Sequence, residues 1–265
     1  FFSPDGTMVI STSDDNTSII WDAQTGKRIR TISGHSDLVN FAAFSPNGRV
    51  VVTASNDHTA KIWDVKTGSE IKSLENSGPV LNASFDSEST QLVTVLKDQP
   101  ALVWDWKNER VISNLAKQNN AIFVDKNHIL CTGHYYARKA KILYAETGDT
   151  KFNLVGHSGP IRNAFYSQDR KRIVTTSNDD TIKIWDANSG QELLSLSSDK
   201  GRPKFAKFSP SGNSIIYERK VGEKLYKEIC IWEAYKWEKT PSIDIYKCKR
   251  YADWLKANEC EVKKN

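Results

Sequence analysis

The chain has 265 residues, of which 38% are hydrophobic and 26% are charged, and its formal net charge is +5. A chain of this length and composition can bury a sizeable core, as a globular protein does. No stretch approaches 18 consecutive apolar residues, so the sequence predicts no membrane span.

The positive charge is concentrated at the C-terminal end. Residues 247–265 hold six Lys or Arg against three Asp or Glu, which leaves +2 for the preceding 246 residues. These 246 residues are too nearly neutral for the excess of Lys and Arg with which proteins bind the nucleic-acid backbone in general. Nucleic acid is therefore not an expected partner. The four cysteines are scattered and none is spaced as C-x-x-C, which argues against a disulfide scaffold and a zinc site. Free thiols of this kind predict an intracellular, cytoplasmic protein.

The predicted elements recur along the chain with a period near 40 residues. The first unit runs from FSPDG at Phe2 to IIWDAQTG, and the second from FSPNG at Phe44 to KIWDVKTG. The third, fourth, fifth and sixth units carry LVWDWKNE, KILYAETG, KIWDANSG and CIWEAYKW. Successive aligned positions are separated by 42, 41, 39, 42 and 47 residues, and they are Trp21, Trp63, Trp104, Leu143, Trp185 and Trp232. Such regular self-similarity is typical of a repeat architecture.

Each unit reads as four short strands. In the second unit, VNFAAFS alternates into a Pro-Asn-Gly turn, RVVVTAS is rich in β-branched residues, TAKIWDV alternates again and GSEIKSLE completes the set. No helical pattern lies between the strands, which excludes a parallel βαβ sheet. Four-stranded units of this length are what a β-propeller requires, because its sheets stack radially as blades.

The combined pattern of GH, FSPDG, S-x-D-x-T and IWD resembles the WD-repeat (WD40) β-propeller family. The resemblance implies an all-β propeller over residues 1–247 and leaves a basic C-terminal tail, 248–265, with apolar residues at the spacing of a short helix. The six recognisable four-stranded blades are expected at approximately 1–33, 34–75, 76–115, 116–155, 156–197 and 198–247. Because the chain opens inside a repeat at Phe1, we expect a piece of a longer protein, with either six blades or a seventh upstream.

The resemblance also implies a structural hydrogen-bond network in each full repeat, which runs from His through Ser or Thr and Asp to Trp. The complete predicted sets are His35, Ser55, Asp57, Trp63 and His157, Ser177, Asp179, Trp185. Partial sets are Ser13, Asp15 and Trp21 in the first repeat, and Asp98 and Trp104 in the third, where Asn76 stands near the His position. Groups of these types, once buried, must satisfy one another.

Ser, His and Asp together also suggest a hydrolase triad, but the pattern argues against one. The set recurs at identical spacing in two repeats, whereas an enzyme needs one site, and no pair of backbone donors for an oxyanion is evident. We therefore predict no catalytic residue, no metal site and no cofactor.

The family's usual partner-binding face is built from the loops that carry the His and the Asp. Matched position by position, the candidates are Leu38, Asn40, Lys97, Tyr135, Tyr136, Arg138, Arg162, Arg202, Lys204 and Tyr226. Blades four to six contribute Tyr, Arg and Lys to this set, and Tyr and Arg are enriched at binding hot spots. This half of the face is expected to receive an acidic or phosphorylated peptide.

Two functions are consistent with these features. The first is a non-catalytic scaffold that binds peptide or protein partners on the propeller face. The alternative is a C-terminal sensor domain of a larger signalling nucleotide-hydrolysing protein, because the DAQTGK and DANSGQ turns resemble those found there. A P-loop would support the alternative, and none occurs in these 265 residues.

Overall fold

The computed structural model describes residues 1–133, 136–197, 203–209, 211–221, 226–233 and 249–250. Every regular element in this part of the chain is a β-strand, which confirms the predicted all-β class. The chain divides into two compact units, one made of Phe1–His134 with Lys141–Lys151 and the other of Tyr135–Ala140 with Phe152–Asn265. Each unit is built from antiparallel sheets that correspond to propeller blades.

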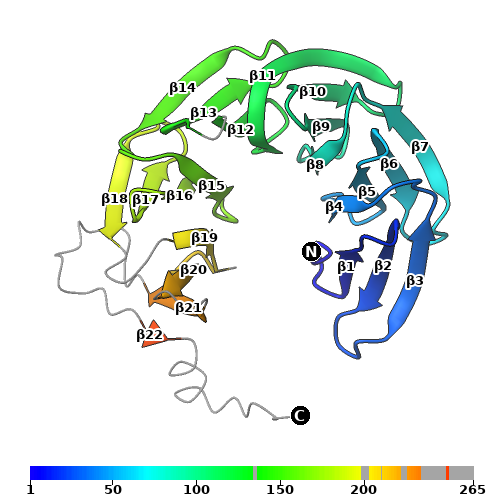
Figure 1. The fold of residues 1–265 in the computed structure, drawn as a ribbon, viewed down its shortest axis with the longest axis horizontal. Coiled ribbons are helices and arrows are strands. Elements are labelled where there is room, and N and C mark those ends of the chain that lie inside the picture. The colour runs from blue at the N-terminus through cyan, green and yellow to red at the C-terminus, as the bar shows by residue number, and fades with distance from the viewer. Residues whose placement is uncertain (134–135, 198–202, 210, 222–225, 234–248, 251–265) are drawn as a thin grey trace. The chain divides into compact units, whose positions relative to one another are not determined.

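The first unit begins with two blades of different size. The second blade is a four-stranded sheet, whereas the first has three strands and an isolated bridge between Phe2 and Val9 in place of its innermost strand. The strands of these blades are β1 (Met8–Thr12), β2 (Thr17–Asp22), β3 (Arg28–Ser33), β4 (Val39–Phe44), β5 (Val50–Ser55), β6 (Thr59–Asp64) and β7 (Glu70–Glu75) (Figure 1).

The third and fourth blades are joined into one seven-stranded sheet. Its strands are β8 (Val80–Phe85), β9 (Gln91–Leu96), β10 (Pro100–Asp105), β11 (Arg110–Phe123), β12 (His128–Gly133), β13 (Lys139–Tyr144) and β14 (Thr150–Val155). β11 has 14 residues, and its first part pairs with β10 while its second part, from Gln118, pairs with β12. The outermost strand of the third blade thus runs directly into the innermost strand of the fourth, where the sequence predicted two separate blades.

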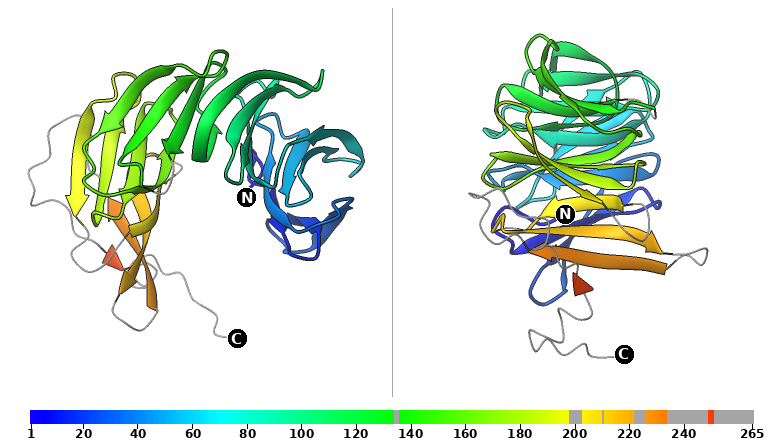
Figure 2. Two further views of the ribbon diagram at one scale, coloured as in Figure 1. Left: turned by 45° about the horizontal axis from the view of Figure 1, so that its top comes forward. Right: turned by 90° about the vertical axis from the view of Figure 1, so that its left-hand side faces the viewer.

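The second unit contains the fifth and sixth blades, each a four-stranded sheet. Their strands are β15 (Ile161–Tyr166), β16 (Arg172–Ser177), β17 (Thr181–Asp186), β18 (Glu192–Ser197), β19 (Pro203–Phe208), β20 (Ser214–Val221), β21 (Tyr226–Glu233) and β22 (Lys249–Arg250). β20 and β21 have eight residues each and extend beyond β19 (Figure 2). β22 lies just beyond the predicted propeller end at 247; the rest of the predicted tail lies outside the described residues.

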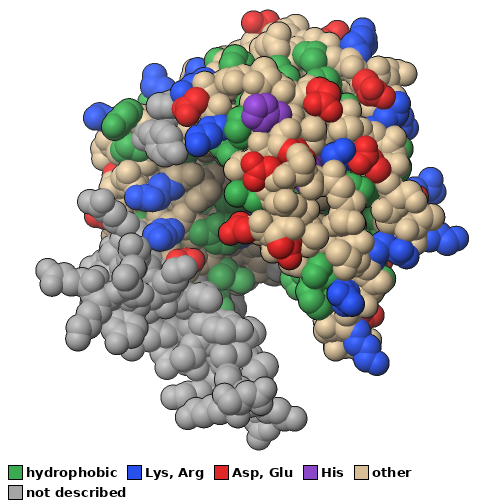
Figure 3. Space-filling view, turned by 45° about the vertical axis from the view of Figure 1, so that its right-hand side comes forward, with side chains coloured by type: hydrophobic (Ala, Val, Ile, Leu, Met, Phe, Trp, Pro, Cys, Tyr) green, Lys and Arg blue, Asp and Glu red, His purple; other side chains and the backbone are tan. Residues whose placement is uncertain are grey.

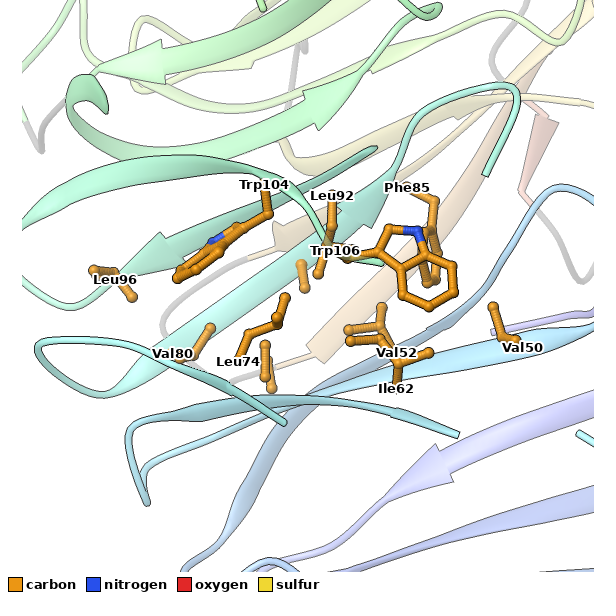
Figure 4. Packing of buried hydrophobic residues seen from close by; sticks show 13 residues of the cluster. Val50, Val52, Ile62, Leu74, Val80, Phe85, Leu92, Leu96, Trp104 and Trp106 are labelled. Atoms are coloured by element: carbon orange, nitrogen blue, oxygen red, sulfur yellow. The ribbon is translucent and has the colours of Figure 1, made fainter. Parts of the chain in front are cut away.

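The hydrophobic core lies between the faces of neighbouring blades. All six residues of β5 are buried, because both faces of this strand are covered, whereas only one residue of the edge strand β7, Leu74, is buried. Figure 4 shows the cluster between the second and third blades, in which Trp104 and Leu92 face Ile62 and Leu74. Side chains from adjacent sheets therefore interdigitate, and each blade depends on its neighbour for burial.

The innermost strands share one irregularity that shapes the rim of the blades. Each has a register shift, a β-bulge, just after the residue at which its pairing with the next strand begins, and the bulge places one extra residue opposite the partner strand. The extra residues are Asn40 in β4, Leu81 in β8, Asn119 in β11, Arg162 in β15 and Lys204 in β19. A bulge re-aims the side chain that it carries, so these positions can differ in chemistry without disturbing the sheet.

In the second to fifth blades, the turn between the third and outermost strands contacts the blade before it. Gly190, in the turn before β18, has φ of 74°. A Cβ atom at this residue would lie 2.6 Å from Cδ2 of Phe152 on β14. Only glycine combines this backbone conformation with so close an approach. In the third blade Glu109 adopts the same left-handed region, with φ of 54°, and its carboxylate pairs with Lys72 on β7.

Candidate functional site

A buried chain of hydrogen bonds runs through the second blade. The indole Nε1–H of Trp63 donates to Oγ1 of Thr53 over 2.8 Å, and this hydroxyl lies 2.6 Å from Nε2 of His35. Nδ1 of His35 lies 2.7 Å from Oδ2 of Asp57, which also accepts a bond from the backbone N–H of Ser36. A consistent set of donors follows the order Trp, Thr, His, Asp, with the proton of a neutral imidazole on Nδ1.

The fifth blade repeats this network in the second unit. Trp185 donates to Thr175 over 2.9 Å, Thr175 lies 2.7 Å from Nε2 of His157, and Nδ1 of His157 lies 2.9 Å from Oδ2 of Asp179. The other oxygen of Asp179 accepts both donors of Thr181. The two networks have the same connectivity, which fits a structural role in each blade.

The hydroxyl in each network is that of Thr53 or Thr175, and not of Ser55 or Ser177 as the sequence led us to predict. Ser55 instead donates to the carbonyl of Asp37 over 2.9 Å, and Ser177 to that of Gly159 over 2.9 Å. Trp63 is paired with Val51, so its indole reaches the diagonal neighbour Thr53 but not the residue two further along. A hydroxyl ten residues before the tryptophan in four repeats was the missed signal, at Ser11, Thr53, Thr94 and Thr175.

The partial sets form shorter networks. In the first blade Trp21 donates to Ser11 over 2.8 Å, while the side chains of Ser13 and Asp15 accept backbone N–H bonds within their own turn. In the third blade Trp104 donates to Thr94, and Thr94 donates to Oδ1 of Asn76 over 3.0 Å, so an amide takes the histidine's place.

Asp98 does not join the third-blade network as predicted. Its exposed carboxylate lies 2.8 Å from Nζ of Lys117. The described residues of the fourth blade form no comparable set, because Leu143 stands at the tryptophan position and β11 continues through the place where the other blades carry the loop with the His.

Burial determines the charge state of the networks. It is the largest influence on His35 and His157 and lowers the pKa of each ring below 6.5, against the opposing effect of the adjacent aspartates. Burial alone would raise the pKa of Asp57, but hydrogen bonds from Thr59, His35 and Ser36 outweigh it and lower that pKa to about 2. The pKa of Asp179 is lowered in the same way. At neutral pH each network therefore pairs a neutral histidine with a carboxylate.

Three of the predicted partner-binding residues lie in the first unit. Asn40 is half-buried, and its amide Nδ2 donates to Oδ1 of Asn56 and to the carbonyl of Val80, each over 2.8 Å. Leu38 is half-buried and Lys97 is exposed. Of these three candidates, only Lys97 is charged.

Four further candidates lie in the second unit. Tyr136 is 84% exposed, and Arg138 beside it is also exposed. Their loop is fixed to β15 by a 2.9 Å bond from the N–H of Ile161 to the carbonyl of Ala137. Arg162 and Lys204 occupy the bulges of β15 and β19.

Two bonds that the sequence did not reveal fix this rim of the second unit. Oδ1 of Asn178 accepts a bond from Nε of Arg162, and Nδ2 of Asn163 donates to the carbonyl of Lys204 over 2.7 Å. Tyr135 and Arg202 lie outside the described residues, and only the backbone of Tyr226, in β21, is described.

Charge is mixed over the described surface. Figure 3 shows basic and acidic side chains interspersed on the face turned toward the viewer. Among the described residues no group of three or more His, Cys, Asp or Glu side chains is placed to hold a metal ion. No helix in that same part of the chain is long and apolar enough to cross a bilayer.

Comparison with known protein families matches residues 1–22, 26–64 and 148–186 to the WD domain, G-beta repeat. Repeated four-stranded blades with a Trp–Thr–His–Asp network define a repeat protein of the propeller class. The three matched segments are similar to WD repeats, which confirms the resemblance seen in the sequence. WD40 repeats serve in general as scaffolds for protein interactions.

Several curated proteins are similar to parts of the chain. Meiotic fizzy-related protein 1 of Schizosaccharomyces pombe is 21% identical over 218 residues, covering 80% of this chain and 52% of that protein. Serine-threonine kinase receptor-associated protein of Mus musculus is 27% identical over 127 residues, with coverages of 46% and 36%. Eukaryotic translation initiation factor 3 subunit I of Caenorhabditis briggsae is 34% identical over 80 residues, with coverages of 30% and 24%. The chain thus spans about half or less of the length of these relatives.

Proposed function

We propose that the protein is a non-catalytic scaffold that binds protein partners through the loops that carry the His and Asp residues. Within this role, the rim of the second unit receives an acidic or phosphorylated peptide. The observation that carries the proposal is the placement of Arg162 and Lys204 on neighbouring bulges, with Arg138 on a loop bonded to the same strand. None of the three cations has an acidic partner among the described residues.

The state of the networks supports a non-catalytic role. In both complete sets the two ring nitrogens of the histidine and both oxygens of the aspartate are already engaged by the protein's own groups. A general base must reach a substrate proton, and a buried histidine with no unoccupied nitrogen is poorly placed to do so. The networks instead hold the turns from which the rim residues project.

Peptide binding tests this proposal directly. Fluorescein-labelled peptide pools that differ only at a central Glu, phosphoserine, Ser or Lys are titrated with the full chain, and binding is followed by fluorescence anisotropy. We expect the two anionic pools to bind more tightly than the other two. The double variant Arg162→Glu, Lys204→Glu should lower their affinity by about tenfold or more, because attraction becomes repulsion.

Lys171→Glu provides the matched control. Lys171 is an exposed cation of the same unit at the opposite end of β16 from Asn178, so its reversal lies away from the rim and changes the net charge by the same amount as either single reversal of Arg162 or Lys204. Anionic pools that bind the rim variant as tightly as the wild type would exclude the rim as the binding site.

A further inference from the structure

The way in which Arg162 is held indicates which kind of anion the rim receives. Its side chain is exposed, and its Nε–H donates to Oδ1 of Asn178. Its two terminal Nη groups have no hydrogen-bond or ion-pair partner among the described residues. A guanidinium anchored through Nε keeps its end-on pair of N–H donors, the pair that binds two oxygens of one anion.

We propose that Asn178 is a positioning residue for Arg162, and that the anchored guanidinium and Lys204 together select a phosphomonoester, such as a phosphoserine side chain, over a carboxylate. This inference rests on the proposed peptide-binding function and specifies its ligand.

Asn178 is well suited to position a side chain because its own turn is fixed. Its backbone N–H donates to the carbonyl of Pro160 over 2.9 Å. The residues on either side are Ser177 and Asp179, which are held by the carbonyl of Gly159 and by His157. The buried network of the fifth blade thereby fixes the acceptor that orients an exposed guanidinium. A ligand meets an Arg162 that has already lost much of its rotamer freedom.

Lys204 supplies the second charge. Asn163, the residue after Arg162, bonds to the carbonyl of Lys204 over 2.7 Å and so ties one bulge to the other. A carboxylate carries one negative charge and is satisfied by Arg162 alone. A phosphomonoester carries about −1.5 to −2 at neutral pH and presents three acceptor oxygens, which matches a guanidinium together with an ammonium group.

The first unit contains the same geometry with neutral chemistry, which supplies an internal control. Asn56 occupies the position of Asn178, and its N–H donates to the carbonyl of Leu38 over 3.1 Å. Its side chain accepts from Asn40, the residue at the bulge of β4, where the second unit has Arg162. Positive charge at this position therefore distinguishes the two units.

The test uses the same four peptide pools and a double-mutant cycle. We expect the phosphoserine pool to bind at least about tenfold more tightly than the Glu pool. Asn178→Ala should lower phosphoserine affinity by about tenfold, because the guanidinium of Arg162 is no longer held in one orientation. Arg162→Lys should lower phosphoserine affinity to the same extent. The double variant should bind phosphoserine no more weakly than either single variant, since both substitutions remove the same contact between the guanidinium and two phosphate oxygens.

Two further variants separate positioning from stability. Asn56→Ala removes the equivalent residue of the first unit and should leave affinity unchanged. Asn178→Asp keeps an acceptor for Nε but adds a negative charge, so it should preserve the urea midpoint while weakening phosphoserine binding.

Each contradicting outcome has a separate meaning. Equal binding of the Glu and phosphoserine pools would overturn the selectivity and leave the proposed function standing. Unchanged phosphoserine affinity in Asn178→Ala would overturn the positioning role. Failure of both anionic pools to bind the wild type would overturn the inference and the proposed rim together.

Discussion

At the scale of single residues, the threonine of each network sets the direction of its hydrogen bonds, in which each group donates to the next in the order Trp, Thr, His, Asp. The hydroxyl of Thr53 accepts a hydrogen bond from Trp63 and donates one to His35, whose opposite nitrogen donates to Asp57. Each donor in this network therefore faces one acceptor of the next residue. Removing the hydroxyl would leave both a buried indole N–H and a buried imidazole nitrogen without a partner, and an unmade buried hydrogen bond costs more than a made one contributes.

Thr53→Val tests this link while keeping the shape of the side chain. We expect the free energy of unfolding to fall by about 1–3 kcal/mol, and the indole N–H of Trp63 to exchange faster with solvent, as followed by NMR. Thr53→Ser is the control, because it retains the hydroxyl and loses one methyl group; the first blade already uses Ser11 in this way. Equal protection of the indole in the two variants would contradict the assignment.

At the scale of elements, the strands of each blade could be predicted from the sequence, whereas their connections could not. The strands could be located from alternating apolar and polar residues and from runs of β-branched residues, because these patterns reflect which faces of a strand are buried, as in β5. The fusion of the third and fourth blades was missed, because nothing in the local pattern distinguishes a strand that ends at Lys117 from one that continues. The bulges were missed for a related reason, since they appear only in the register between two strands.

Glycine in the turn before β18 gives a prediction at this scale. Gly190→Ala places a methyl group 2.6 Å from Phe152 in the left-handed conformation, so it combines backbone strain with a clash between blades. Gly26→Ala has the same strain, with φ of 68°, but nothing within 4 Å of its Cβ. Urea unfolding should show Gly190→Ala to be the less stable variant by about 1–3 kcal/mol. Equal midpoints would mean that the turn can move away from β14.

At the scale of the whole molecule, each unit contains one complete network, so acid should act on both. The pKa of His35 and of His157 is lowered in the folded protein, while the unfolded chain takes up protons near pH 6.5. As pH falls below 6.5, the unfolded state binds protons that the folded state does not, and stability is lost until the folded pKa is reached. Asp57, with a pKa of about 2 against 3.8, adds a further loss below about pH 3.8.

A variant with Asn at both histidines should flatten this dependence. The third blade provides the precedent, since Asn76 accepts from Thr94 without titrating. We expect the wild type to lose at most about 1.4 kcal/mol per pH unit for each histidine below pH 6.5. The His35→Asn, His157→Asn variant should lose little over pH 6.5–5, in urea midpoints measured across pH 5–8. Parallel profiles for the two proteins would show that the histidines do not carry the effect.

The candidate site could be predicted only in part for a comparable reason. Repeat spacing located His157, Asp179 and Trp185, because each has a fixed place in the repeat. Arg162 and Lys204 were located in the same way, but their fixation by Asn178 and Asn163 depends on contacts across 16 and 41 residues. Such contacts follow from strand register, which the sequence does not display.

The unbroken strand β11 has a consequence for how the chain can change by insertion and duplication. Extra residues in a loop between blades cost little entropy and leave both sheets intact. β11 has no such loop, and its one extra residue, Asn119, is already taken up as a bulge, so a further insertion would shift the pairing register of the strand. An insertion, deletion or duplication within β11 would therefore affect the third and fourth blades together, because both sheets share this strand.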